Sequence, residues 1–219
     1  MQNKFLKATF ILMIGGLITK LLGFAIRIIY TRMVGSDAIN LYSLVMPTYS
    51  LLLTIATLSL PVVISKLISE HKTKSIKILS SATAITLILN VIVIVIIYFT
   101  KDFIATTLLH DERCSVLLMS MALTFPFVSL SSVLKGYFYG KQKMGPHTIS
   151  NVIEQIVRII LIFLIIPSLV NKGIVYSVMG LILISIASEL ASIFTFLVFL
   201  PKKFKITKED LKPDMKTAK

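Results

Sequence analysis

The stretch LILNVIVIVIIYF (Leu87–Phe99) is an apolar run broken only by Asn90. It lies inside a longer run, residues 78–100, that contains no charged residue. An α-helix needs about 20 apolar residues to cross the hydrocarbon core of a bilayer. The stretch therefore predicts a membrane-spanning helix.

The composition of the whole chain favours the same interpretation. Of its 219 residues, 56% are hydrophobic and 15% are charged, whereas soluble domains have roughly 45–50% and about 25%. So few charged residues could hardly cover a water-exposed surface. The single Cys114 excludes an intramolecular disulfide framework. The three histidines are far apart in expected loops and give no support for a metal site: His71, His110 and His147.

Six apolar runs of sufficient length follow one another and predict an all-α, polytopic membrane helix bundle. They cover residues 5–33, 41–68, 78–100, 115–139, 149–170 and 174–200. We therefore expect a transmembrane unit over residues 1–200, followed by a basic cytoplasmic tail over residues 201–219. The first run has no small-residue cleavage site, so we expect a retained helix and not a signal peptide.

Lys and Arg residues are distributed unevenly over the connections between these runs. With the N-terminus in the cytoplasm, 16 fall on the cytoplasmic side and four on the other. The cytoplasmic set is Lys4, Lys7, Lys66, Lys72, Lys74, Lys77, Lys135, Lys141, Lys143 and seven lysines from Lys202 to Lys219; the opposite set is Arg32, Lys101, Arg113 and Lys172. This asymmetry predicts a multi-pass protein of the cell membrane with both termini in the cytoplasm. Because the net charge of +13 is spread over short loops, it does not predict nucleic-acid binding.

The first run carries two charges at a depth where charges are costly. Lys20 and Arg27 lie inside it, and each costs roughly 2.5–3.5 kcal/mol on insertion scales. Gly16, Lys20, Gly23 and Arg27 have the i, i+4, i+7, i+11 spacing of one helix face. Two interpretations stay open: a stripe that faces a cavity, or long side chains that extend toward the two membrane interfaces. The central position of Lys20 favours the cavity.

A second polar stripe occurs in the fifth run, in NVIEQIVRI (residues 151–159). Asn151, Glu154, Gln155 and Arg158 have the spacing i, i+3, i+4, i+7, and Glu154 can pair with Arg158 within the helix. The stripe predicts either a self-neutralised pair packed on a neighbouring helix or the polar wall of a water-filled path.

The sixth run adds Glu189 near its middle. Its charge could be balanced by Lys20 or Arg27, or it could be protonated when buried. Ionisable groups of both signs on three membrane helices indicate a functional site.

Three prolines lie within predicted spans, Pro47 and Pro61 in the second and Pro126 in the fourth. Proline removes a backbone donor and clashes with the preceding turn, so we expect helix kinks. Kinked helices around a polar interior are typical of proteins in which one bundle moves against another.

Catalytic patterns are missing from the sequence. It has no Ser/His/Asp set within reach, no glycine-rich phosphate loop and no metal-ligand spacing. We therefore expect neither an enzyme nor a bound cofactor or metal.

The segment LKGYFYGKQKMGPHTISNVIEQIVRI (Leu134–Ile159) resembles the region around helices four and five of the stage V sporulation protein B group. The opening helix and Glu189 in ASELAS also resemble that group. It belongs to the multidrug/oligosaccharidyl-lipid/polysaccharide exporter superfamily, alongside the lipid II flippases. Two positions depart from the pattern: Tyr139 stands where Gln is usual, and His147 where Thr is commoner.

The resemblance implies a bilobed helix bundle with a central cavity, of which these six helices would be one lobe. It implies transport or flipping of a lipid-linked oligosaccharide or polysaccharide precursor, in sporulation and spore-cortex formation. The first-helix residues would then contact the anionic part of the lipid: Lys20, Arg27, Gly16 and Gly23. A second group would act in gating or ion coupling: Asn151, Glu154, Gln155, Arg158 and Glu189. The expected partners are the lipid-linked saccharide, membrane lipids and a second lobe.

Alternatives of other classes stay open. One is a cation-coupled multidrug extruder of the same fold, and another is a non-transporting membrane scaffold for wall synthesis. The length of one lobe favours a truncated or split gene product over a dimerising half-transporter or an intentional fragment. Residues 201–219 would then be the linker toward the second lobe.

Overall fold

The structure is a computed structural model that describes residues 2–57, 60–71 and 75–200. The helices in these ranges are α1 (Gln2–Val34), α2 (Ser36–Thr57), α3 (Leu60–Glu70), α4 (Ser75–Phe103), the π-helical turn η2 (Ile104–Leu108), α5 (Arg113–Ala122), α6 (Phe125–Gly140), α7 (Met144–Val170) and α8 (Ile174–Phe199). The described ranges contain no strand. The predicted all-α class is confirmed.

Six stretches of these helices are long and apolar enough to cross a membrane. They are Thr9–Val34, Ser36–Glu70, Ser75–Leu108, Arg113–Gly140, Met144–Val170 and Ile174–Phe199. Each corresponds to one of the six apolar runs of the sequence. The prediction of a six-helix membrane bundle is therefore confirmed.

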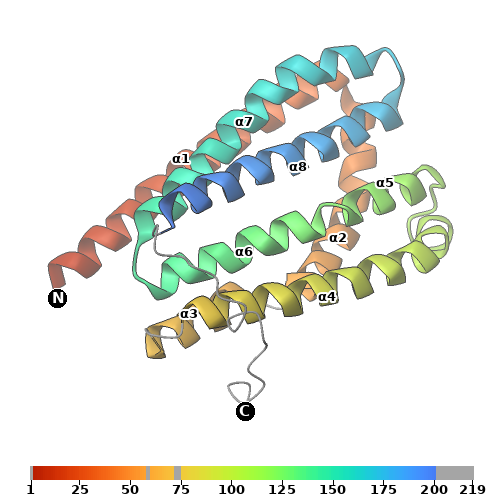
Figure 1. Ribbon diagram of the computed structural model, residues 1–219. Coiled ribbons are helices and arrows are strands. Elements are labelled where there is room, and N and C mark those ends of the chain that lie inside the picture. The colour runs from red at the N-terminus through yellow and green to blue at the C-terminus, as the bar shows by residue number, and fades with distance from the viewer. Residues whose placement is uncertain (1, 58–59, 72–74, 201–219) are drawn as a thin grey trace.

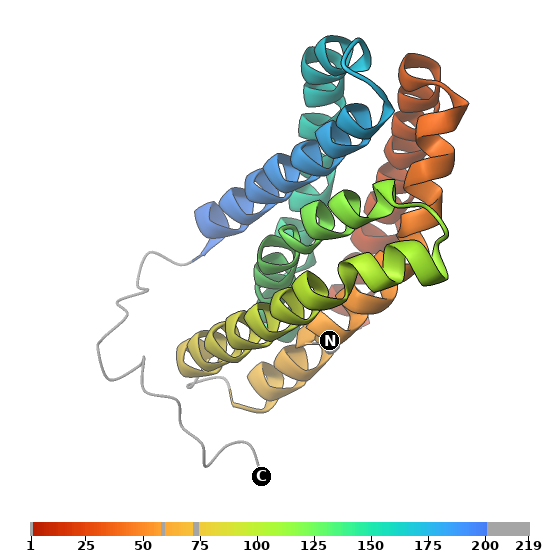
Figure 2. The same ribbon diagram turned by 90° about the vertical axis from the view of Figure 1, so that its right-hand side faces the viewer.

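The helices form two groups that α2 connects (Figure 1). In one group α7 packs between α1 and α8, and in the other α6 packs against α3 and α4. Contacts between α6 and α8 join the groups, and α2 runs obliquely from the end of α1 toward α3 (Figures 1 and 2). A cavity lies where α1, α2, α7 and α8 surround a common space.

The fourth predicted span is broken in the structure, because it consists of α5 and α6. Pro126 lies in the first turn of α6, where the missing N–H of proline needs no intrahelical partner. Between α2 and α3 lie residues 58–59, which are outside the described residues. The helix kinks expected at Pro61 and Pro126 stay predictions. Pro47 does lie inside α2.

Small residues let α6 approach α3 closely. A methyl group added at Gly140 would lie 2.7 Å from Ile68 Cβ, and one at Gly136 would lie 2.9 Å from the Pro61 carbonyl oxygen. Contacts this short leave no room for a side chain. Glycine therefore fixes the spacing of these two helices.

The beginning of α1 and the end of α8 lie at the same end of the bundle (Figure 1). This agrees with an even number of crossings. The predicted tail over residues 201–219, with its seven lysines, lies outside the described residues, as do Lys72 and Lys74.

Candidate functional site

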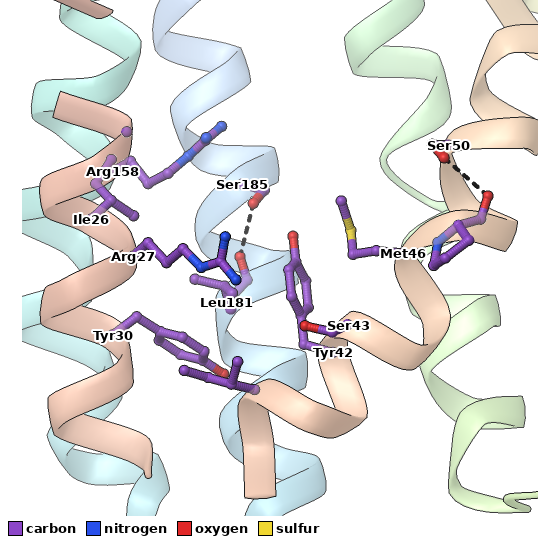
Figure 3. Close-up of a pocket in the computed structure, with 13 residues that line it drawn as sticks. Ile26, Arg27, Tyr30, Tyr42, Ser43, Met46, Ser50, Arg158, Leu181 and Ser185 are labelled. Atoms are coloured by element: carbon purple, nitrogen blue, oxygen red, sulfur yellow. Dashed lines mark hydrogen bonds between the residues drawn. The ribbon is translucent and has the colours of Figure 1, made fainter. Parts of the chain in front are cut away.

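A cavity of about 650 Å³ lies between α1, α2, α7 and α8. Figure 3 shows its lining, with Tyr42 and Met46 from α2 opposite the residues of α1. Two arginines, two tyrosines and three serines face apolar side chains there. The lining consists of Gly23, Ile26, Arg27, Tyr30, Ile39, Tyr42, Ser43, Met46, Pro47, Ser50, Arg158, Leu181 and Ser185. Among these residues there is no carboxylate.

The two arginines reach this cavity from neighbouring helices. Arg27 extends from α1 and Arg158 from α7, on the side where Ser185 of α8 lies (Figure 3). Tyr30 is buried below them, and its hydroxyl donates to the Ser177 carbonyl oxygen at 3.4 Å. Arg27 has no carboxylate partner among the ion pairs of the described residues, so it gives this cavity wall an unpaired positive charge.

The predicted ion pair within α7 is present. Arg158 Nη2 donates to Glu154 Oε1 at 2.8 Å, and Arg158 Nε donates to Ser188 Oγ on α8 at 3.2 Å. Glu154 is buried, whereas the Arg158 side chain is 22% exposed. These bonds fix the guanidinium at the cavity wall and leave other N–H donors for a ligand. Gln155 is also buried, beside this pair in the sequence.

The cation nearest to Glu189 is one that the sequence analysis did not predict as its partner. Lys135 Nζ of α6 lies 4.0 Å from Glu189 Oε1, in place of the expected Lys20 or Arg27. Lys135 lies within α6. The sequence did give one sign that Lys135 lies in a helix, because it is one helical turn inside the end of the fourth apolar run.

The predicted stripe on α1 is divided between two hollows. Gly23 and Arg27 line the large cavity, whereas Gly16 and Lys20 line a hollow of about 270 Å³ between α1 and α7. A methyl group at Gly16 or Gly23 would meet no atom within 4 Å. These glycines therefore border open space, and Lys20 and Arg27 line different hollows.

The smaller hollow also contains Asn151 and His147. Tyr139 Oη is hydrogen-bonded to His147 Nε2 at 2.8 Å, and Asn151 Nδ2 lies 3.3 Å from the same nitrogen. The two departures from the pattern of the resembling group, Tyr139 and His147, are thus bonded to each other. His147 lies in α7 and not in a loop as expected.

Comparisons with known proteins identify the family of this chain. The family described as "Polysaccharide biosynthesis protein" matches residues 5–218. The chain is 39% identical over 210 residues to stage V sporulation protein B of Bacillus subtilis (strain 168). That alignment covers 92% of this chain and 40% of the relative. The chain is 30% identical over 194 residues to the lipid II flippase MurJ of the same organism, and this alignment covers 81% of this chain and 36% of the relative.

The chain is also 30% identical to the sporulation protein YkvU of Bacillus subtilis (strain 168) over 164 residues, with 74% of this chain and 36% of that protein covered. No solved structure gives a significant match. The chain thus spans less than half the length of these curated relatives. The family match nevertheless covers nearly all of the chain, which belongs to the polysaccharide biosynthesis protein family.

Proposed function

We propose that this chain forms a lobe of a membrane flippase for a lipid-linked polysaccharide precursor. The main support for this proposal is the cavity, whose lining has two arginines and no carboxylate. Guanidinium groups bind phosphate oxygens through paired N–H donors, so the wall suits the phosphate linker of such a lipid. Similarity to a lipid II flippase supports the same cargo class.

Arg27 and Gly23 are the primary contacts in this proposal. Arg27 has no carboxylate partner among the ion pairs of the described residues, so its charge is available to a ligand. Lys20 and Gly16 would contact the same cargo from the smaller hollow farther along α1. A positively charged cavity wall repels cations, so it disfavours the alternative of an extruder for cationic drugs.

The polar groups behind the cavity would control the transport cycle. Glu154, Arg158 and Glu189, with Asn151 and Gln155, are the candidates for gating or ion coupling. Glu154, Gln155 and Glu189 are buried on α7 and α8, so a change in one of their bonds would alter helix packing.

The wider setting is also a proposal. A sporulation role, including spore-cortex formation, is supported by the similarity to stage V sporulation protein B. Since that relative is longer, we propose that a second lobe completes the central cavity, with residues 201–219 leading toward it. Both termini would lie in the cytoplasm, because of the lysine distribution.

The test is equilibrium binding of farnesyl pyrophosphate to the purified chain in lipid nanodiscs. Arg27→Gln should weaken binding by about tenfold or more, the effect of losing a charge-assisted hydrogen bond worth roughly 1.5–3 kcal/mol. Arg32→Gln on the same helix is the matched control, because Arg32 does not line the large cavity. Lys20→Gln should have a smaller effect than Arg27→Gln. Equal binding by wild type and Arg27→Gln would contradict the proposal.

A further inference from the structure

Lys135 and Glu189 form a pair between a partly exposed lysine and a buried carboxylate, and neither residue lines the cavity. Their side chains are 22% and 8% exposed, and Lys135 Nζ lies 4.0 Å from Glu189 Oε1. This distance is too long for a hydrogen bond, and Glu189 Oε1 has no hydrogen-bond partner among the described residues. A buried carboxylate oxygen without a donor is costly, so this pair needs a reason.

The pair is adjacent to the ion pair that faces the cavity. Arg158 donates from Nε to Ser188 Oγ, and Ser188 is the residue before Glu189 on α8. Arg158 therefore lies against the same helical turn that carries Glu189. The four groups Glu154, Arg158, Lys135 and Glu189 balance each other in charge.

Two cations therefore lie near Glu189. Lys135 approaches it from α6, and Arg158 approaches the same turn from α7. A guanidinium has five N–H donors, and the described bonds of Arg158 use only Nε and Nη2. If Glu189 lost Lys135, its buried charge would attract the remaining donors of Arg158, which are those that the cavity presents to a ligand.

We propose that Lys135 is a positioning residue for the anion site: it neutralises Glu189 and thereby keeps Arg158 available to the cavity. The inference rests on the proposed function, because it assumes that an anion binds beside Arg158. Lys135 itself does not touch the ligand. By neutralising Glu189, it leaves Arg158 paired with Glu154 alone.

The experiment is a double-mutant cycle, with farnesyl pyrophosphate binding to the purified chain in nanodiscs as readout. Lys135→Met should weaken binding by about tenfold, because Glu189 then withdraws donors from the ligand. Lys135→Met with Glu189→Gln should return to within about threefold of wild type, since the competing charge is gone. Lys135→Arg should bind like wild type because it keeps the charge. Lys143→Met, at an exposed lysine, is the matched control.

The cycle separates positioning from a merely structural role. If the double variant binds as weakly as Lys135→Met, or if Glu189→Gln alone is equally weak, the pair acts only as a structural unit and the inference is wrong. If wild type and Arg27→Gln bind the probe equally, the proposed function fails instead. Inorganic pyrophosphate and farnesol, titrated in parallel, show whether the phosphate groups alone or the whole lipid carry the affinity.

A second variant protects the test against misfolding. Lys135→Gln removes the charge but keeps a donor for the orphan oxygen of Glu189, so it should fold where Lys135→Met does not. It should weaken binding in the same direction, and adding Glu189→Gln should restore it. Unchanged binding in monodisperse Lys135→Gln would overturn the inference.

Discussion

At the scale of single residues, the sequence predicted the pair within a helix but not the pair between helices. Glu154 and Arg158 are four residues apart, and the helix repeat alone brings them together. Lys135 and Glu189 meet because one particular face of α6 packs on α8. Periodicity describes the faces of each helix, but it does not say which faces pack together, so this contact could not be predicted.

Removing one partner of the α7 pair should destabilise the protein. Glu154→Gln leaves the partly exposed guanidinium of Arg158 without its carboxylate, so we expect a loss of about 1–3 kcal/mol, below the 3–5 kcal/mol of a fully buried pair. The measurement is thermal unfolding of the purified protein in detergent. Glu112→Gln, at an exposed carboxylate, is the control.

Charge reversal provides the opposing test of this pair. Glu154→Arg combined with Arg158→Glu should unfold at a higher temperature than either single variant, because the pair is rebuilt in reverse order. A double variant no more stable than the singles would show that the two groups act independently.

At the scale of helices, hydropathy predicted the spans and missed the break in the fourth one. The end of α5 lies inside continuous apolar sequence, so a hydropathy profile does not register it. Pro126 indicated the region, because it lies in the first turn of α6. The stripe on α1 was correctly placed within one helix, but its division between two hollows depends on how α2 and α7 pack around it.

Close packing of α6 on α3 gives a stability prediction. Gly140→Ala would place a methyl group 2.7 Å from Ile68 Cβ and 2.8 Å from the Ser65 carbonyl oxygen, and overpacking of this kind costs about 1–3 kcal/mol. Gly145→Ala is the matched control, because a methyl group there would meet no atom within 4 Å. Equal unfolding temperatures of the two variants would refute the close approach of α6 to α3.

The connection between α6 and α7 offers a test of two hydrogen-bonded residues, Tyr139 and His147. Tyr139→Phe removes the hydroxyl that is hydrogen-bonded to His147 and should cost about 1 kcal/mol, the typical net value of such a bond. The double change Tyr139→Gln with His147→Thr should recover stability relative to Tyr139→Gln alone, as measured by thermal unfolding. Additive losses in the double variant would mean that the two positions are not coupled.

At the scale of the whole molecule, the sequence was sufficient for the class of fold and the number of crossings. The orientation in the membrane stays a prediction from the lysine distribution, and cysteine labelling can test it. Cys114 is fully buried, so the native thiol should give little background. An impermeant thiol reagent on intact cells should label Lys172→Cys more strongly than Lys143→Cys, and the reverse result would invert the topology.

The central claim is that the cavity between α1, α2, α7 and α8 holds the anionic head of a lipid-linked saccharide. The most direct measurement is photo-crosslinking in cells with benzoylphenylalanine at Ser43, followed by mass spectrometry of the adducts. Ser43 lines the cavity, and Phe99, which is 78% exposed on α4, is the control position. We predict isoprenyl phosphate saccharide adducts at Ser43, reduced by Arg27→Gln, and only ordinary phospholipid adducts at Phe99. The same phospholipid adducts at both positions would contradict the account.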